Sequence, residues 1–414
     1  MRGVTATNAR ALLQRFGTFM DGFSVCFSRR PQRAAATQYL EGRFNDSERK
    51  SMQAMHGRLS DPVTYQALQH FITDSPWDAG RVWTQLRARV PVRAGILALD
   101  DTGFPKQGRR SVGVKRQYCG ALGKIGNCQV AVSSVLIGDG RTWPLTFELY
   151  LPEEWMTDPD RRAAAGIPDR LRFREKWRIA LAHVRTVLQA GFQLDGVAVD
   201  ADYGSNAAFR RGLERLGLRY GVAIRGDLAM WTAEAGRPHR AAALAEAIPA
   251  GDWTAVTWGT GTKGPLTAHF LALRVRPTKS RGDRWLLCER SADDQIRKYY
   301  LLNLDPTAAL RDLVALARSR WPLEQQYREL KDELGVDHFE GRSYRGWAHH
   351  TVLAAVAFTF LQLERGRTDD DTPRPTLPHV RTWVREVTAV LYIIHSRKVL
   401  NLIDNFRRDP PLRR

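Results

Sequence analysis

The sequence predicts an α/β protein: a mixed sheet flanked by helices, interrupted by a β-rich insertion, with helical regions at both ends. Three observations support this prediction. In the middle of the chain, short apolar runs alternate with amphipathic segments, which is typical of a sheet covered by helices. A later stretch contains short strand-like runs separated by Gly, Pro and Arg turns. Both ends of the chain carry apolar residues at helical spacing.

These patterns divide the chain into four predicted parts. The division is a helical N-terminal domain over 1–90, a core over 91–225 and 307–345, a β-rich insertion over 226–306, and a helical C-terminal region over 346–414. The N-terminal part is a small basic helical bundle. Such a bundle can bind DNA, and it can equally be an ordinary packing domain, so the sequence leaves both interpretations open.

The predicted elements follow in order along the chain. Helices are expected over 8–20, 34–40, 47–59, 65–71 and 77–90, with Asn45 and Ser47 as candidate N-caps of the third. A buried strand over 94–99 ends at Asp100 and Asp101, and an antiparallel meander over 113–120, 127–138 and 143–151 follows. Next come a helix over 169–191, a strand over 196–199 that ends at Asp200, a helix over 207–216 and a strand over 218–224.

The insertion and the C-terminal part complete the pattern. Strands are expected over 269–275, 284–289 and 298–304, and the Gly-rich run 259–264 is predicted to be a loop, because it lacks the spacing of a phosphate-binding loop. Helices are expected over 310–334, 351–363 and 380–399, with a linker or exposed loop over 366–378.

Composition favours an intracellular protein with a polyanionic partner. The chain has 414 residues and a formal net charge of +19, and only 10 of its 63 basic residues are Lys. Arg suits bidentate phosphate contacts, although a GC-rich genome also favours it. Such a charge most often serves nucleic-acid binding. The four Cys residues form no CxxC pair, and no apolar run is long enough to span a bilayer, so a cytoplasmic protein is expected.

Three carboxylates are the candidate site. Asp100 and Asp200 each follow a strand-like run, and Glu324 lies on a predicted helix where Arg320, Arg328 and Lys331 share its face. Carboxylates are hard oxygen ligands that suit Mg²⁺, and phosphodiester chemistry by two such ions needs a set of this kind. Taken alone, the helix pattern also fits a solvated face with salt bridges, and acids after strands are common as helix caps.

Several stretches together resemble the DDE superfamily of insertion-sequence transposases, in the cut-and-paste branch with the Y-R-E-K signature. The first-acid block of this family resembles residues 100–108 together with 113–118. Its next signature resembles residues 143–152 together with 165–168. Residues 200–204 resemble the second-acid block, and 320–331 the third. The similarity covers most of the chain. It implies an RNase H-like fold and an Mg²⁺-dependent endonuclease and strand transferase that cleaves and joins DNA.

Two features depart from the family pattern or leave a choice. The Tyr of the third signature falls on Ala317, so its stacking or phosphate role is missing or moved. The first block offers both Asp100 and Asp101. The family pattern of Asp, any residue, Thr matches Asp100 with Thr102, so Asp100 is preferred and Asp101 is the second choice. The same reasoning prefers Asp200 to Asp202 and Glu324 to Glu329.

The resemblance implies a set of roles. Asp100, Asp200 and Glu324 are expected to hold two Mg²⁺ ions, with Mn²⁺ as a substitute. The expected partners are double-stranded DNA, both terminal inverted repeats and target, and a second copy of the chain when the ends are paired. A bacterial, nucleoid-associated location follows. The predicted DNA contacts are Arg320, Arg328, Lys331, Lys106, Lys115 and Arg116.

Two other functions remain open. The chain could be a domesticated DNA-binding protein that does not cleave, or an RNase H-like nuclease that cuts without joining. The complete acid triad argues against the first, because no structural role requires all three acids. Flanking inverted repeats would separate the first alternative from a transposase, and a joining assay would separate the second. The pair His349 and His350 is interpreted as packing or phosphate contact rather than as a metal site or proton shuttle.

Overall fold

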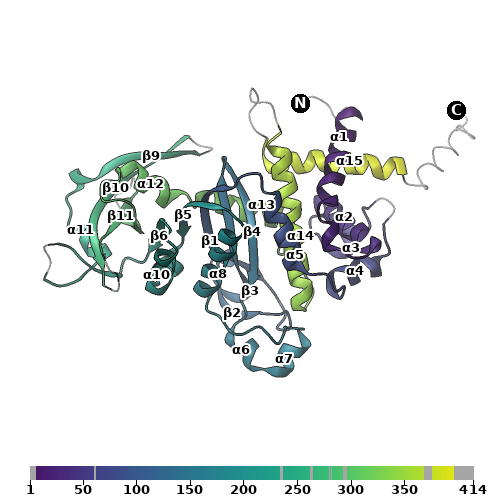
Figure 1. Ribbon diagram of the computed structural model, residues 1–414, viewed down its shortest axis with the longest axis horizontal. Helices are drawn as coiled ribbons and strands as arrows, with labels where there is room; N and C mark the ends of the chain where they lie inside the picture. Colours follow the sequence, from purple (N-terminus) through teal and green to yellow (C-terminus); the bar gives the residue numbers. More distant parts are fainter. Residues whose placement is uncertain are drawn as a thin grey trace, which may run out of the picture.

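The computed structural model describes residues 6–59, 62–233, 236–261, 264–278, 280, 282–291, 296–367 and 375–395. Its centre is a large mixed sheet, with helices on one side of the molecule and a β-rich lobe on the other (Figure 1). The predicted α/β class is confirmed. In the described part of the chain, no helix is long and apolar enough to cross a membrane.

The core strands occur in the order β4-β3-β1-β5-β6. β3 runs antiparallel to β1 and to β4, whereas β1, β5 and β6 are parallel neighbours. Their bounds are β1 Ala94–Pro105, β3 Lys124–Gly138, β4 Arg141–Leu149, β5 Gln193–Val199 and β6 Tyr220–Ile224. The short β2, Lys115–Cys119, pairs with the start of β3. This order, with its antiparallel second strand, is the predicted RNase H-like sheet.

Apolar runs explain why the parallel strands lie at the centre. Leu97, Leu99, Val197 and Val199 are fully buried, because helices cover the sheet. The helices between β4 and β6 are α6 Glu153–Thr157, α7 Pro159–Ala164, α8 Lys176–Gln189, α9 Ala201–Gly204 and α10 Ala207–Arg215. α8 begins seven residues later than the predicted helix over 169–191, since residues 169–175 form a turn and extended chain.

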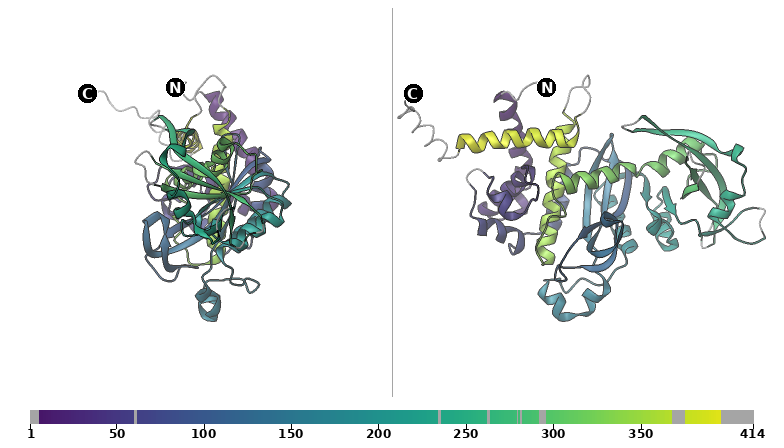
Figure 2. Two further views of the ribbon diagram at one scale, coloured as in Figure 1. Left: turned by 90° about the vertical axis from the view of Figure 1, so that its left-hand side faces the viewer. Right: turned by 180° about the vertical axis from the view of Figure 1, so that it is seen from behind.

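The β-rich insertion continues the core sheet. Its last strand, β12, pairs antiparallel with β6, and β11 and β10 extend the sheet beyond it. Its elements are β7 Ala229–Trp231, β8 His239–Arg240, α11 Ala241–Glu246, β9 Thr254–Gly261, β10 Gly264–Pro277, β11 Arg284–Arg290 and β12 Ile296–Leu302. The predicted loop over 259–264 joins β9 to β10, although its described residues belong to the two strands. The hairpin of β9 and β10 projects from this lobe (Figure 2).

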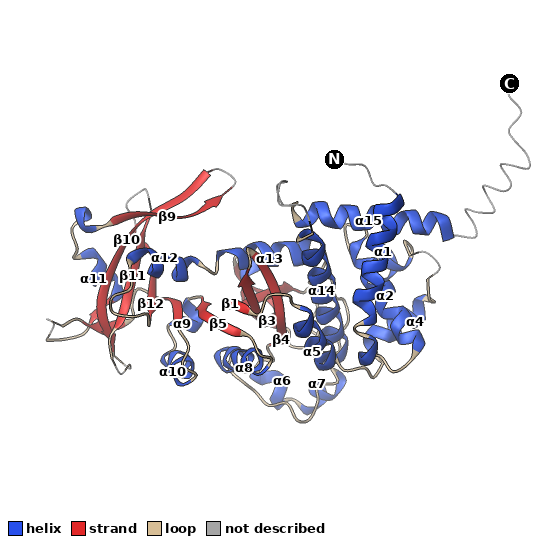
Figure 3. Ribbon diagram, turned by 45° about the horizontal axis from the view of Figure 1, so that its top comes forward, coloured by secondary structure: helices blue, strands red, loops and turns tan. Residues whose placement is uncertain are grey.

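The helices of the two chain ends pack together. They are α1 Ala6–Asp21, α2 Arg30–Phe44, α3 Met52–His56, α4 Tyr65–Thr73, α5 Ala79–Arg89, α14 Tyr344–Arg365 and α15 Leu377–His395. α14 lies between the sheet and the helices α1, α2 and α4 (Figure 3), and its residues are buried almost all round. One apolar cluster includes residues from α1, α2, α4, α5, α14 and α15. The predicted domain boundaries remain predictions, but the two helical regions share this core.

Two predicted helices differ from those observed. The helix expected over 47–59 is only α3, and Ser51 rather than Asn45 or Ser47 caps it, accepting from the Ala54 N–H at 3.3 Å. Asn45 instead accepts from the Ser47 N–H at 3.0 Å, which forms a local turn. The helix expected over 310–334 is two helices, α12 Leu310–Arg318 and α13 Trp321–Asp332.

Candidate active site

Asp100 and Asp200 come together at the end of a parallel strand pair. β1 and β5 pair as far as Leu99 and Val199, and each acid is the next residue along the chain. The two carboxylates therefore emerge at the same edge of the sheet. The prediction that the first strand ends at Asp100 and Asp101 is wrong. β1 continues to Pro105, because β3 still pairs with it where β5 has ended, and Asp100 lies opposite Ser133.

Asp200 is also the N-cap of α9. Its Oδ1 accepts from the backbone N–H groups of Asp202 at 3.1 Å and Tyr203 at 3.3 Å. Gly204 lets this short helix lie against β6, since a Cβ there would come 1.9 Å from the carbonyl oxygen of Ala223. A larger residue would push α9 and the Asp200 carboxylate away from β1. The second-acid block thus has a packing reason for its glycine.

Arg320 lies among the three candidate acids. Its guanidinium forms an ion pair with the Asp100 carboxylate, and its Nη2 lies 3.9 Å from Oε1 of Glu324. Burial raises the pKa of Asp100, Arg320 lowers it, and Asp200 raises it further. Burial likewise raises the pKa of Asp200, with Arg320 acting in the opposite direction. The acid pair thus favours a positive charge beside it, and Arg320 supplies one.

Pro322 explains why Glu324 is on a separate helix. A proline ring clashes with the carbonyl four residues earlier and offers no N–H, so it fits the first turn of a helix but not its interior. The chain therefore breaks at Ser319 and Arg320, and α13 restarts with Pro322 in its first turn. Glu324 lies in that turn with its side chain 63% exposed. Its carboxylate faces solvent beside Arg320.

Asp101 has a different environment from Asp100. Its carboxylate accepts from the Lys176 ammonium and the Tyr203 hydroxyl, which come from α8 and α9. These contacts tie β1 to the two helices that follow β4 and β5. Sequence reasoning missed Lys176 and Tyr203, although Tyr203 stands three residues after Asp200 in the second-acid block. The choice of Asp100 as the first site acid stays a prediction.

The Tyr expected in the third signature has no counterpart at its usual place. Ala317 is buried in the apolar cluster beneath α12. The nearest tyrosine on α13 is Tyr327, whose hydroxyl bonds to the Ser133 Oγ on β3. Burial raises the pKa of Tyr327 well above its usual value, and Asp100 adds to the shift. Tyr327 therefore packs, un-ionised, beneath the acid pair.

The six predicted DNA contacts fall into two groups. Lys106 donates to the Phe339 carbonyl at 2.6 Å and Lys331 to the Gly103 carbonyl at 3.1 Å, so both ammonium groups are engaged within the fold. Arg320 is engaged by Asp100, as described. The exposed members are Arg328, Lys115 and Arg116. DNA contact stays a prediction for all six, and among the exposed three Lys115 lies 3.4 Å from the Glu154 carboxylate.

The donor set suits a hard divalent cation in part. Asp100 and Asp200 offer carboxylate oxygens at one edge, and such oxygens are the ligands that Mg²⁺ and Mn²⁺ prefer. Glu324 joins them only through Arg320, and the described residues contain no group of three or more His, Cys, Asp or Glu side chains close enough to hold a metal ion. Bringing Glu324 to the pair requires Arg320 to release Asp100.

The two histidines of α14 belong to the packing. His349 is 2% exposed and His350 is 1% exposed, and both rings bond to backbone carbonyl groups. His349 stacks on Trp77 with 3.5 Å between ring centroids. Of the two alternatives left by the sequence, the structure supports packing.

A mixed sheet of this order, with two carboxylates where the parallel pairing of β1 and β5 ends, defines an RNase H-like protein with an acidic site. Comparison with known families is more specific. Residues 22–265 match the model of the DDE superfamily endonucleases, and residues 178–360 match that of the transposase DDE domain. The chain therefore belongs to the DDE superfamily, as the sequence motifs predicted.

Two individual proteins are similar to the chain. A probable transposase for insertion sequence element IS701, from Microchaete diplosiphon, is 35% identical over 198 residues, which cover 46% of this chain and 49% of the relative. The chain thus spans about half the length of the curated relative that it matches. The structure of a piggyBac transposase synaptic complex with hairpin DNA aligns with 91% of this chain and 76% of its own, at 11% identity and a TM-score of 0.47.

Proposed function

We propose that this protein is a DNA transposase that cleaves and joins phosphodiester bonds at the ends of an insertion sequence. The observation that carries the proposal is the juxtaposition of Asp100 and Asp200 where the parallel strands β1 and β5 stop pairing, with Arg320 and Glu324 beside them. Membership of the DDE superfamily supports it. Double-stranded DNA is the proposed substrate, and a net charge of +19 favours its binding.

In this proposal Asp100, Asp200 and Glu324 hold two Mg²⁺ ions. When bound, these ions activate the attacking oxygen and stabilise the leaving one. Asp100 exchanges its ion pair with Arg320 for this role, and α13 carries Glu324 toward the pair. Arg320, released from Asp100, remains close enough to contact a DNA phosphate, for which its planar fork is suited.

The proposed chemistry has two steps. Water attacks a phosphodiester at the element's end, the P–O3′ bond breaks, and a 3′-hydroxyl and a 5′-phosphate result. That 3′-hydroxyl then attacks a target phosphodiester, so one P–O bond forms as another breaks and no external energy source is needed. No side chain becomes bonded to DNA in either step.

The test is nicking of supercoiled plasmid in Mn²⁺, which needs no knowledge of the end sequence. Asp100→Asn, Asp200→Asn and Glu324→Gln should each lower nicking more than about a thousandfold, because each removes a charged metal ligand. DNA binding should change little. Matched controls are Asp202→Asn and Glu329→Gln, which remove a carboxylate from the same two segments and should nick normally.

Equal nicking by the wild type and Glu324→Gln would contradict the assignment of the third acid. DNA binding without nicking by any form, in the presence of a plasmid carrying the element's ends, would contradict cleavage altogether. The joining step needs its own assay, with a pre-cleaved end and a target plasmid.

A further inference from the structure

The hairpin formed by β2 and the first residues of β3 extends beyond the rest of the sheet. β2 pairs with residues 124–128 of β3, whereas β1 pairs from Cys128 onward and β4 from Ala131 onward. Residues 124–127 thus have β2 as their strand partner. This segment, Lys115–Cys128, is called the ribbon below, and it starts ten residues after the end of β1.

The two faces of the ribbon differ in character. Cys119 and Cys128 are fully buried on the inner face, where they pack with Val130 and hold the ribbon to the body. On the outer face Tyr118 and Ile125 are directly opposite one another, and they are 65% and 60% exposed. Leu122 at the turn is 41% exposed. An exposed aromatic–aliphatic pair of this kind marks a contact surface.

The charged residues in this stretch of the chain are all positive. Between Asp101 and Asp139 the chain contains no Asp or Glu, and it contains six basic residues: Lys106, Arg109, Arg110, Lys115, Arg116 and Lys124. All of these except Lys106 are exposed. An acid near them is Glu154, whose Oε2 lies 3.4 Å from the Lys115 ammonium. The surface is therefore complementary to a polyanion and unfavourable for a second copy of this basic chain.

We propose that the ribbon is a DNA-contacting arm that enters the major groove of duplex DNA next to the active site. The major groove admits a two-stranded β-ribbon. Tyr118 and Ile125 would contact base edges and thymine methyl groups. Lys115, Arg116 and Lys124 would contact the flanking phosphates. The proposal deepens the proposed function, since it takes duplex DNA as the substrate and names the surface that holds it.

The position of the ribbon fits this role. β1 carries Asp100 and leads directly into the acid-free stretch. Pro105 lies opposite Cys128, and Ile125 stands three residues before Cys128 on β3. These eight residue steps between Asp100 and Ile125 span about 26 Å at about 3.3 Å per residue, which is under one turn of duplex DNA. DNA held by the ribbon would therefore reach the acids within one helical turn.

The test measures binding of the full-length protein to a fluorescent random-sequence duplex as salt is varied. Lys115→Gln/Arg116→Gln/Lys124→Gln should reduce the slope of log K against log salt by up to about 2.7, at about 0.9 per lost phosphate contact. Tyr118→Ser/Ile125→Ser should weaken binding about tenfold with little change in slope, because it removes apolar contacts only. Tyr118→Phe keeps the ring and should bind like the wild type.

A net-charge control is available at the other end of the sheet. Arg237→Gln/Arg240→Gln/Arg276→Gln removes three exposed charges near β8 and β10. If this control lowers affinity and slope as much as the ribbon variant does, binding follows net charge and the proposal is wrong. Wild-type binding by both ribbon variants would also overturn it. So would a loss of self-association by Tyr118→Ser/Ile125→Ser with unchanged DNA binding, since the ribbon would then bind a second copy.

Plasmid nicking in Mn²⁺ separates this proposal from the proposed function. If the wild type nicks plasmid and the ribbon variants bind DNA normally, the proposed transposase function stands and the proposed DNA-contacting arm is wrong. If the ribbon variants lose DNA binding but the wild type never nicks plasmid, the DNA-contacting arm stands and the proposed cleavage activity is wrong. All variants lie on exposed side chains, and their thermal midpoints check that the fold is intact.

Discussion

At the scale of single residues, the adjacent acids Asp100 and Asp101 of β1 have different partners. Asp100 faces Arg320 and Asp200, whereas Asp101 binds Lys176 and Tyr203. Alternation of side chains along a strand separates the two environments. The sequence offered both as candidates and preferred Asp100 on the family pattern, and the packing of α8, α9 and Arg320 gives the two carboxylates different partners.

Histidine burial gives a residue-scale prediction about pH. His349 lies between the carbonyl groups of Ile72 and Trp77, each 2.9 Å from a ring nitrogen. Burial lowers the pKa of His349 to about 4, and Arg345 also lowers it, whereas the two carbonyl contacts and Asp78 raise it. The folded protein therefore keeps this ring neutral at a pH where the unfolded chain protonates it.

The sign of the effect follows from proton uptake on unfolding. The contribution of the neutral His349 ring to the free energy of unfolding is fully present above pH 6.5. It is lost progressively as pH falls toward about 4, on the order of 3 kcal/mol in total. Urea unfolding from pH 4.5 to 7 should show a falling free energy of unfolding with acidification. His349→Leu should be less stable at pH 7 but show a flatter pH profile. An equally steep profile in the variant would assign the effect to other groups.

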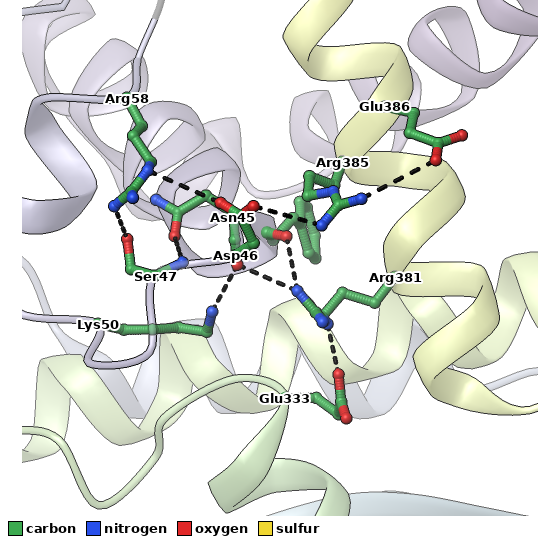
Figure 4. A network of polar contacts seen from close by, with 10 residues as sticks. Asn45, Asp46, Ser47, Lys50, Arg58, Glu333, Arg381, Arg385 and Glu386 are labelled. Carbon is green, nitrogen blue, oxygen red and sulfur yellow. Dashed lines mark hydrogen bonds and ion pairs between the residues drawn. The ribbon is translucent and has the colours of Figure 1, made fainter.

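At the scale of elements, α15 holds the end of the helix that carries Glu324. Figure 4 shows Arg381 of α15 between Glu333, the C-cap of α13, and the chain after α2. Arg381 forms an ion pair with Glu333 and donates to the carbonyl oxygens of Phe44 and Asn45 at 3.3 and 3.1 Å. The C-terminal helix thus links α13 to the N-terminal helices through one guanidinium.

Removing the Arg381 guanidinium should therefore lower the free energy of unfolding. Arg381 and Glu333 are 16% and 17% exposed, so Arg381→Gln leaves a largely buried carboxylate unpaired and should lower the free energy of unfolding by about 2–3 kcal/mol. Glu333→Gln, which keeps an acceptor, should cost about 1 kcal/mol. The control Arg385→Gln, whose partner Asp46 lies 3.4 Å away on the exposed side, should cost under about 0.5 kcal/mol. Equal losses for Arg381 and Arg385 in urea titrations would contradict this role.

Elements also show where sequence reasoning succeeds. Strands with apolar runs, such as 196–199, and helices with strong periodicity, such as 207–216, were predicted to within a few residues. The ends were missed where tertiary pairing decides them: β1 runs past Asp100 because β3 continues beside it. Pro322 indicates the break before α13. The helix-forming residues on both sides of it led to the prediction of one continuous helix over 310–334. Lys176 was beyond prediction, since its contact with Asp101 spans two elements.

At the scale of the whole molecule, the insertion and the core share one sheet. Four residue pairs join β12 to β6, from Tyr299 with Ile224 to Leu302 with Gly221. The apolar cluster beneath α12 includes Phe270, Leu287 and Tyr300 from the insertion. Arg318 of α12 also donates to the Glu289 carboxylate at 3.1 Å. The insertion therefore completes the core rather than being attached to it by a linker.

This continuity predicts opposite outcomes for two deletions. Removing 226–306 would expose the edge of β6 and the apolar face of α12, so the product should lack a cooperative thermal transition and near-ultraviolet circular dichroism.

The hairpin of β9 and β10 is more exposed, and the hydroxyls of Thr257 and Thr267 bond to each other at 2.7 Å on its surface. Replacing 257–267 with a two-residue turn should shift the thermal midpoint by less than about 3 °C. Cooperative unfolding of the larger deletion would show instead that the insertion is an independent domain, and the antiparallel pairing of β12 with β6 would then contribute little to the stability of the core.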